Sequence, residues 1–308
     1  MITRRIHLPL IAALFLVSSF ATACSSGDDA AEPAEPTAAA DLAPTDAPVA
    51  EAPPAEAPEV VIDASDFGYS GPSEVPAGLT KLTMMNKGTQ MHQVAMMQLT
   101  GGKTYQDYTA YAETATETDP MPEWLVPAGG PVAAVPSMQA SAFVDLQAGT
   151  YVLVCNIPDA QGVPHFKLGQ VGTLQVTEAA ADAAVAAAPE ADQTIGLADF
   201  AFNVPAELSA GAHVFDVTNE GAQPHEAVLM KLDEGATAGD VAAAFAPGAS
   251  GPPPAMPVGG VAGIAPGASQ FFPADLSPGR YALLCFYPDA ASGKVHAELG
   301  MMAEFDVK

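Results

Sequence analysis

Short apolar segments alternate with turn residues along most of this 308-residue chain. Segments that mix β-branched and other apolar residues, and that are bounded by Gly, Pro or Asn, are typical of short strands. The clearest are Lys81–Met85, His92–Leu99, Thr150–Cys155 and Val171–Val176. Helical patterning is convincing only over Tyr105–Glu113 and Thr237–Phe245. The pattern therefore predicts an all-β protein whose two helices lie within loops that connect strands.

The second half of the chain repeats the pattern of the first. Asp66-Phe67-Gly68-Tyr69 returns as Asp199-Phe200-Ala201-Phe202, and Pro127-x-Gly-Gly returns as Pro257-x-Gly-Gly. Further matches are Asn86, Gly88, Gln90 and His92 against Asn219, Gly221, Gln223 and His225, and Gly149, Tyr151, Leu153, Cys155 and Pro158 against Gly279, Tyr281, Leu283, Cys285 and Pro288. A repeat of this length is a normal size for one β-sandwich domain.

These patterns divide the chain into five parts. We expect two tandem antiparallel Greek-key β-sandwich domains, preceded by a leader and a tether and separated by an Ala-rich acidic linker. The predicted boundaries are 1–23 for a signal peptide, 24–58 for the tether, 59–177 for the first domain, 178–193 for the linker and 194–308 for the second domain.

The N-terminus has the pattern of an export signal. Arg4 and Arg5 precede a short apolar run, and small residues lie just before Cys24. Ala-Thr-Ala-Cys resembles the lipobox of bacterial lipoproteins, which implies that Cys24 is lipidated and anchors the chain in a membrane. Ala-x-Ala also suits ordinary signal peptidase, which would release the chain. Either way we expect an exported protein that faces the periplasm or the cell exterior, held away from the membrane by its Pro-rich tether.

The formal net charge of −26 bears on possible partners. Such a charge disfavours binding to nucleic-acid phosphates and favours a partner with a cationic face. A generally acidic surface, adapted to salt or solubility, is the better explanation for most of the charge.

Each repeat places one His after an Asn-x-Gly turn, a Cys at the end of a later strand, and a second His beyond a loop. The first repeat has His92, Cys155, His165 and then Gln170, and the second has His225, Cys285, His296 and then Met301. A thiolate and two imidazoles, with a weak axial Met or Gln, form the ligand set of a type 1 copper site. The sequence therefore predicts up to two copper ions per chain, cycling between Cu(I) and Cu(II).

Both repeats resemble cupredoxins, the blue-copper family, in Asn-x-Gly-x3-His, in Gly-x-Tyr-x-Leu-x-Cys-x2-Pro, and in the distal His followed by Leu-Gly. The resemblance implies that the two His and one Cys of each repeat are equatorial ligands, that Gln170 and Met301 are axial, and that His165 and His296 lie near an apolar surface as electron ports. It implies a one-electron carrier that exchanges electrons with a redox partner at the cell envelope.

Two other interpretations remain open from the residues. Cys155 and Cys285 could form one disulfide, although this leaves the repeated histidines unexplained. The module could also be non-redox, handling copper or serving as a metal-free binding domain. No His-x-His pair occurs, and Val154 and Leu284 rather than His precede the cysteines, so the sequence predicts that the chain is not an enzyme.

Overall fold

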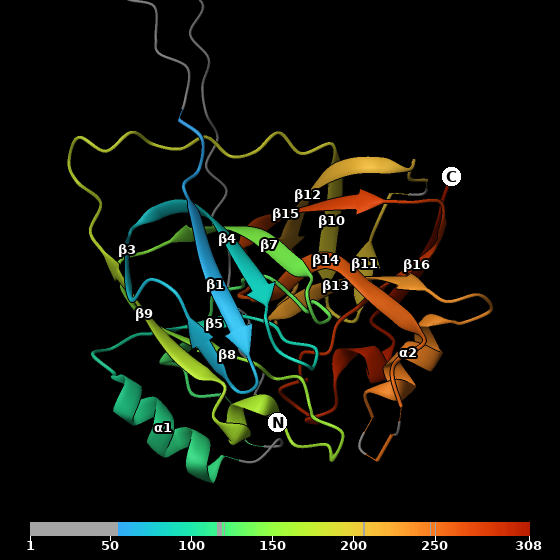
Figure 1. The fold of residues 1–308 in the computed structure, drawn as a ribbon, viewed down its shortest axis with the longest axis horizontal. Helices are drawn as coiled ribbons and strands as arrows, with labels where there is room; N and C mark the ends of the chain where they lie inside the picture. Colours follow the sequence, from blue (N-terminus) through green and yellow to red (C-terminus); the bar gives the residue numbers. More distant parts are fainter. Residues whose placement is uncertain (1–54, 116–118, 120, 206, 247, 250) are drawn as a thin grey trace, which may run out of the picture. The chain divides into compact units, whose positions relative to one another are not determined.

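The computed structural model describes residues 55–308 except 116–118, 120, 206, 247 and 250 (Figure 1). All described residues belong to one compact unit. The predicted leader, Cys24 and the tether up to residue 54 lie outside the described residues. None of the described helices has the length and apolar character needed to cross a membrane.

The first repeat is built from strands with one α-helix in its variable middle. In chain order these are β1 (Glu59–Ser65), β2 (Gly68–Ser70), β3 (Glu74–Pro76), β4 (Gly78–Asn86), β5 (Ala95–Leu99), α1 (Tyr105–Thr114), β6 (Leu125–Pro127), β7 (Gln139–Leu146), β8 (Gly149–Val154), the 3₁₀ turn η1 (His165–Leu168) and β9 (Val171–Thr177).

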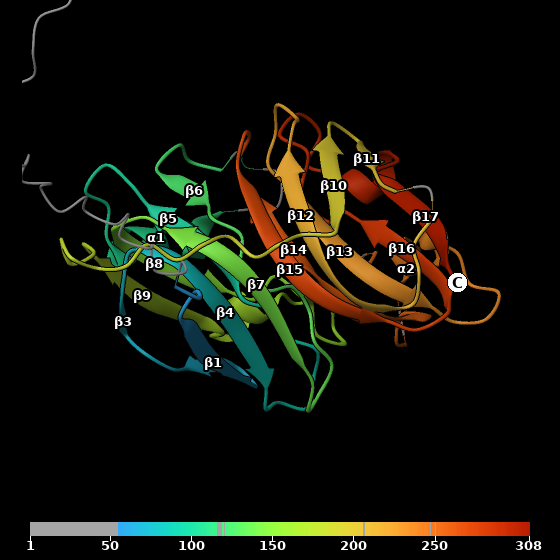
Figure 2. The same ribbon diagram turned by 90° about the horizontal axis from the view of Figure 1, so that it is seen from above.

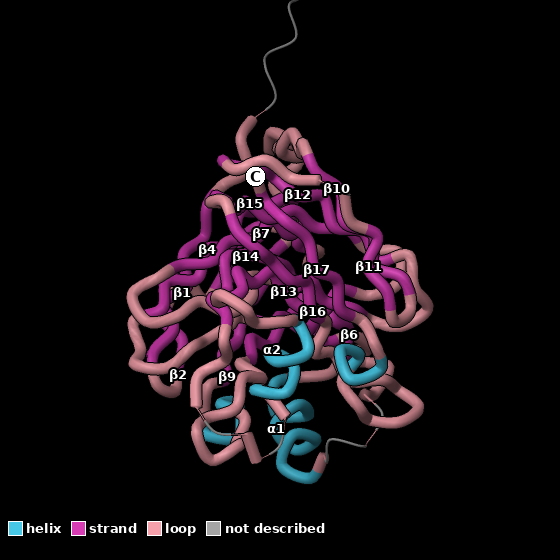
Figure 3. The backbone as a smooth tube through the Cα atoms, turned by 90° about the vertical axis from the view of Figure 1, so that its right-hand side faces the viewer, coloured by secondary structure: helices cyan, strands magenta, loops and turns pink. Residues whose placement is uncertain are grey.

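The second repeat follows nearly the same order. Its elements are β10 (Gln193–Ala198), β11 (Ala201–Asn203), β12 (Gly211–Asn219), β13 (His225–Leu232), α2 (Ala238–Ala244), β14 (Ala255–Ile264), β15 (Ser269–Leu276), β16 (Gly279–Leu284), the 3₁₀ turn η2 (His296–Leu299) and β17 (Met302–Val307). The all-β prediction and both predicted helices are confirmed, and in Figure 3 the helices lie in loops outside the strands.

Local sequence explains where these elements begin and which face they bury. Thr104 and Thr237 cap α1 and α2, and the carboxylates of Asp107 and Asp240 accept a hydrogen bond from the backbone N–H of the capping residue. In β12 alternate residues point inward, so that Phe215 is buried and stacks on Phe272 with ring centroids 4.7 Å apart. Strand periodicity thus determines which side chains reach the core.

The strands form three sheets, one of which contains strands from both repeats. The eight-stranded sheet has the order β11-β10-β12-β15-β7-β4-β1-β2, and β15 joins β7 at Phe271 and Phe143. The sheet β3-β9-β8-β5-β6 belongs to the first repeat and β14-β13-β16-β17 to the second. Figure 2 shows the repeats side by side, with β7 and β15 where they meet. Two sandwiches therefore share one continuous sheet.

Most strand pairs are antiparallel, as expected for a Greek-key sandwich, but three described pairs run parallel. These are β1 with β4, β10 with β12, and β3 with β9. In each repeat the first long strand lies beside the strand that ends at the Asn-x-Gly turn. That pairing brings the Asp that follows the first strand close to this turn.

The two repeats also meet along equivalent backbone segments, near the Pro-x-Gly-Gly motifs. Gly129 N donates to Gly263 O at 2.9 Å, and Ala262 N donates to Gly130 O at 2.8 Å. Val132 of the first repeat packs in an apolar cluster of the second, and the equivalent Ala262 packs in the matching cluster of the first. The contact is thus reciprocal, as in a two-fold dimer interface. The predicted domain boundaries themselves stay a prediction.

Candidate metal centres

The structure brings together the two histidines and the cysteine predicted in each repeat. His92, Cys155 and His165 form one group and His225, Cys285 and His296 form the other, with the candidate ligand atoms of each group within 4.8 Å of one another. All six side chains are fully buried. Both cysteines are free thiols, so the disulfide interpretation is wrong.

The sheet framework positions these side chains in the same way in both repeats. Cys155 directly follows β8 and Cys285 directly follows β16. The next turn folds back, so that His165 N donates to Ile157 O and Phe166 N donates to Cys155 O, at 3.0 and 2.9 Å. His296 N and Ala297 N make the equivalent bonds to Tyr287 O and Cys285 O. The extra residue in the second Cys-to-His loop leaves this backbone frame unchanged.

The predicted axial residues are tied to the same frame. Cys155 N donates to Gln170 O, and Gln170 N donates to His165 O. Cys285 N and Met301 N make the matching bonds to Met301 O and His296 O. Gln170 and Met301 are both fully buried. Gln170 Nε2 donates to Ser65 O at 3.2 Å, whereas Gln170 Oε1 is buried without a hydrogen-bond partner among the described residues.

The donor atoms themselves fit a metal ion. In the second repeat His225 Nδ1 and His296 Nδ1 lie 2.9 Å apart, and they lie 4.0 and 3.4 Å from Cys285 Sγ. In the first repeat His165 Nδ1 lies 3.4 Å from Cys155 Sγ, and His92 Nδ1 is buried without a partner in the described part of the chain. An unsatisfied buried polar atom costs about 1–3 kcal/mol, which a bound cation would offset. The two groups fit type 1 copper sites.

Burial controls the protonation of these groups. It raises the pKa of the Cys155 thiol to about 11. The pKa of the Cys285 thiol is also raised, by burial and by the Glu226 carboxylate. Burial and the neighbouring histidine lower the pKa of His165, and the same causes lower that of His296 to about 4, so these imidazoles are neutral with a lone pair to donate. Metal binding as a thiolate would therefore release a proton.

Backbone donors face each sulfur. Glu226 N donates to Cys285 Sγ at 3.4 Å. Against the larger effect of burial, the backbone N–H groups of Gln93 and Ile157 lower the pKa of the Cys155 thiol, and those of Glu226 and Tyr287 lower the pKa of the Cys285 thiol. Such bonds stabilise a thiolate and restrain its direction.

The histidines expected to act as electron ports are themselves buried. His165 and His296 are both fully buried, and their role as electron ports stays a prediction. Phe67 packs on His165 with ring centroids 4.8 Å apart, and Phe200 packs edge-on against His296 at 5.2 Å. Leu168 and Leu299, on the same 3₁₀ turns, are the partly exposed apolar side chains nearby in sequence, at 40 % and 37 %.

Three acidic residues at the sites carry roles that sequence reasoning missed. Asp66 accepts a hydrogen bond from His92 Nε2, and Asp199 accepts one from His225 Nε2. Both belong to the repeated Asp-Phe motif, and their constant spacing from the histidines was the available signal. Glu226 follows His225 and is buried, which raises its pKa to about 7, and its Oε1 accepts from Phe286 N at 2.9 Å. Its counterpart in the first repeat is the neutral Gln93.

No protein-family model matches this chain, and no curated protein sequence is similar to it. Similar solved structures include auracyanin from Roseiflexus castenholzii, at 22 % identity and a TM-score of 0.27 over 39 % of this chain and 99 % of that one. Azurin from Methylomonas sp. strain J matches at 19 % identity and a TM-score of 0.27, over 37 % and 95 % of the two chains. Copper nitrite reductase from Nitrosomonas europaea matches at 13 % identity and a TM-score of 0.24, over 82 % and 94 %.

The structure and these similarities bear on two predictions. The resemblance to cupredoxins is confirmed by the structure itself, since the chain folds into β-sheets and its two His–Cys–His groups fit type 1 copper sites. The prediction that the chain is not an enzyme is wrong, because multicopper oxidases and copper nitrite reductases, which are enzymes, are also among the similar structures.

Proposed function

We propose that this chain is a copper-binding electron-transfer protein of the cell envelope. The observation that carries the proposal is the pair of fully buried His–Cys–His groups, each with its donor atoms within 4.8 Å of one another. His92, Cys155 and His165, with Gln170 as axial ligand, would hold one copper ion. His225, Cys285 and His296, with Met301 as axial ligand, would hold the other.

The chemistry of the donor set suits a one-electron centre. Thiolate and thioether sulfur favour Cu(I), and imidazole suits both oxidation states. Copper bound there would supply a reversible one-electron couple. The protein contributes fixed ligands, because the backbone bonds between Cys, His and axial residue keep them in place, and burial excludes water from the donor atoms.

The different axial residues support an ordered pair of sites. An amide oxygen from Gln170 is a harder donor than the Met301 sulfur, so it should favour Cu(II) and give the first site the lower reduction potential. Electrons would then pass from the first repeat to the second within one chain.

The cellular setting of the proposal comes from the sequence. Export and lipidation at Cys24 would anchor the protein at the membrane, and the net charge of −26 favours a redox partner with a cationic docking face. The alternative is a non-redox envelope module, which either hands copper on or binds no metal.

Copper loading of the exported chain tests the proposal. Titration with Cu(II) should give the intense colour of thiolate-to-copper charge transfer at two copper ions per chain. Cys285→Ser and Cys155→Ser should each abolish one of the two sites. His213→Gln is the matched control, because His213 is a buried histidine that belongs to neither group.

The outcomes separate the candidates. Stable binding in both oxidation states supports an electron carrier. Binding of Cu(I) alone, with rapid transfer to a chelator, would support copper handling instead. A colourless chain that takes up no copper would leave only the metal-free module.

A further inference from the structure

The first histidine of each candidate site binds a carboxylate through its far nitrogen. His92 Nε2 lies 2.6 Å from Asp66 Oδ1, and His225 Nε2 lies 2.9 Å from Asp199 Oδ1. Both histidines are fully buried, while the side chains of Asp66 and Asp199 are 23 % and 38 % exposed. Each pair thus extends from the buried site to the protein surface.

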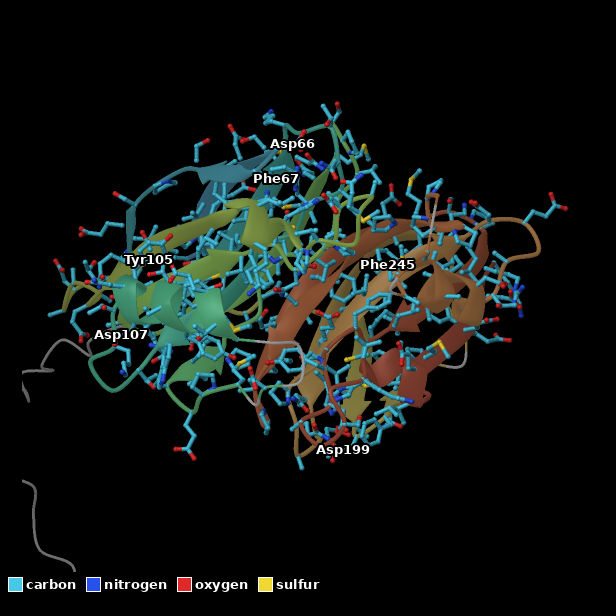
Figure 4. All side chains as sticks on the ribbon, turned by 90° about the horizontal axis from the view of Figure 1, so that it is seen from below. Asp66, Phe67, Tyr105, Asp107, Asp199 and Phe245 are labelled. Carbon is cyan, nitrogen blue, oxygen red and sulfur yellow. The ribbon has the colours of Figure 1, made fainter. Side chains whose placement is uncertain are left out.

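The carboxylates are themselves fixed by the turn that precedes each histidine. Thr89 donates to Asp66 from its backbone N–H, at 2.9 Å, and from its hydroxyl. The N–H groups of Ala222 and Gln223 donate to Asp199 at 2.9 and 3.4 Å. Asp66 and Asp199 directly follow β1 and β10, and Figure 4 labels both side chains. Each Asp is therefore held in place independently of the histidine.

The glycine of each Asn-x-Gly turn leaves room for the pair. A Cβ at Gly221 would lie 2.5 Å from Asp199 Oδ1 and 2.6 Å from His225 Nε2, and one at Gly88 would collide with Asp66 Oδ1 and His92 Nε2. Real Cβ atoms do not approach other atoms so closely. Asn86 and Asn219 hold these turns, since their Oδ1 atoms accept from Gly88 N and Gly221 N at 2.9 Å. The repeated motif thus serves the carboxylate–histidine pair as well as the turn.

We propose that Asp66 and Asp199 are positioning residues that fix the proton of His92 and His225 on Nε2 and so direct the Nδ1 lone pair at the metal. An imidazole with its proton on Nδ1 cannot donate from that atom, so the tautomer decides whether the site is competent. The negative charge of the Asp carboxylate also makes the imidazole a stronger electron-pair donor to the metal, and it stabilises the more positive oxidation state of the metal ion. The effect should be larger in the first repeat, where the hydrogen bond is shorter.

The metal part of this inference rests on the proposed copper sites, whereas the tautomer part concerns the protein alone. The variants are Asp199→Ala, which removes the acceptor, and Asp199→Asn, which keeps an acceptor and removes the charge, with the same pair at Asp66. Asp192→Asn is the matched control, because Asp192 binds His213 Nδ1 at 2.6 Å outside both His–Cys–His groups.

The first measurement is ¹⁵N NMR of the imidazoles in the metal-free exported chain at mildly alkaline pH. His92 and His225 should carry their proton on Nε2, and Asp199→Ala should move His225 to a mixture of tautomers. Gly221→Ala should do the same by displacing the pair. Finding His225 with its proton on Nδ1 in the parent chain would overturn the inference.

The second measurement is copper affinity and reduction potential at each site. Asp199→Ala should weaken copper binding in the second repeat by about 10–100-fold, the usual effect of removing a residue that supports a metal ligand. Asp199→Asn should retain the colour and raise the potential, and Asp192→Asn should leave both unchanged. Unchanged affinity and potential in all Asp66 and Asp199 variants would reject the role. If the parent chain binds no copper, the proposed function fails while NMR still decides the positioning role.

Discussion

The two repeats hold their candidate metal sites with the same backbone hydrogen bonds, but the side chains around the two sites differ. The first has Gln170, a shorter Asp–His bond supported by Thr89, and the neutral Gln93 beside its first histidine. The second has Met301, a longer Asp–His bond supported by backbone N–H groups, and the buried Glu226. Both repeats have the same backbone hydrogen bonds that link the Cys to the segment of the second His and to the predicted axial residue. The repeats thus share the backbone frame of the site and differ in the side chains around it.

The largest effect on stability is expected at glycines that the two repeats share. Gly130 and Gly260 have positive φ, and a Cβ at either would collide with the carbonyl oxygen of Val94 or Ala227, respectively. We expect Gly130→Ala and Gly260→Ala each to lower the unfolding free energy by about 3 kcal/mol, because backbone atoms must move and φ is strained. Denaturant unfolding measures this loss.

Gly78 and Gly211 provide the control for that comparison. They have similar positive φ values, but a Cβ at either meets nothing within 4 Å. Substitution by Ala should therefore cost only the backbone strain, about 1–2 kcal/mol. Equal losses at all four positions would show that close packing of the glycines contributes nothing.

A smaller effect is expected at the contact between the repeats, which is asymmetric at one residue. Gln270 is buried, donates to Ala128 O at 2.7 Å and accepts from Gly130 N at 3.2 Å, whereas the equivalent residue of the first repeat is Ala140. Gln270→Ala should cost about 1–3 kcal/mol, because it leaves buried backbone groups without partners. Calorimetry should show this loss, while Gln147→Ala, at an exposed side chain, should change stability by less than about 0.5 kcal/mol.

Exchanging the axial residues tests the functional side of the comparison. Gln170→Met should raise the reduction potential of the first site and Met301→Gln should lower that of the second, each on the order of 60 mV, a tenfold change for one electron. Spectroelectrochemical titration of the copper-loaded variants measures both. Potentials that do not respond would mean that neither residue is an axial ligand.

The smallest expected effect is a pH dependence of stability, which comes from the side chains at the first strand pair of each repeat. Asp192 binds His213 in the second repeat, where the first repeat has Glu59 bound to Lys81 and Thr83. Burial lowers the pKa of His213, but the bonds to Asp192 and Ser209 O outweigh this, so the net shift is upward. The stabilisation is therefore fully present below about pH 6.5, the ordinary pKa, and is lost as pH rises through the raised value.

The acid limit of this interaction comes from Asp192. Its hydrogen bonds to His213 and Val214 N lower its pKa from 3.8 to about 2, so its contribution is lost as pH falls through that range. Because Asp192 is half-exposed, we expect about 0.5 kcal/mol after solvent screening. Unfolding at mildly acidic and mildly alkaline pH measures it, and His213→Gln should remove the difference. A pH dependence that survives in this variant would assign it to other groups.

Much of this molecule could be predicted from short patterns. Strands such as β8 and β9, and helices α1 and α2, follow from local apolar patterning and capping residues. The six equatorial candidates followed from spacing, since a repeated His, Cys and His would rarely arise together by chance. Asp66 and Asp199 were visible as repeated residues, but sequence could not give them a role, because their contact depends on the parallel pairing of β1 with β4 and of β10 with β12.

The sequence by itself determined the repeat, the strand-rich class and the candidate donor residues, because these depend on residue type and local order along the chain. Only the tertiary structure decided that β7 and β15 join the repeats in one sheet, that both cysteines stay free, and that the distal histidines are buried under Phe67 and Phe200. These features depend on contacts between residues far apart in sequence. No local pattern specifies such contacts, since many segments distant in sequence could pack against the same apolar face.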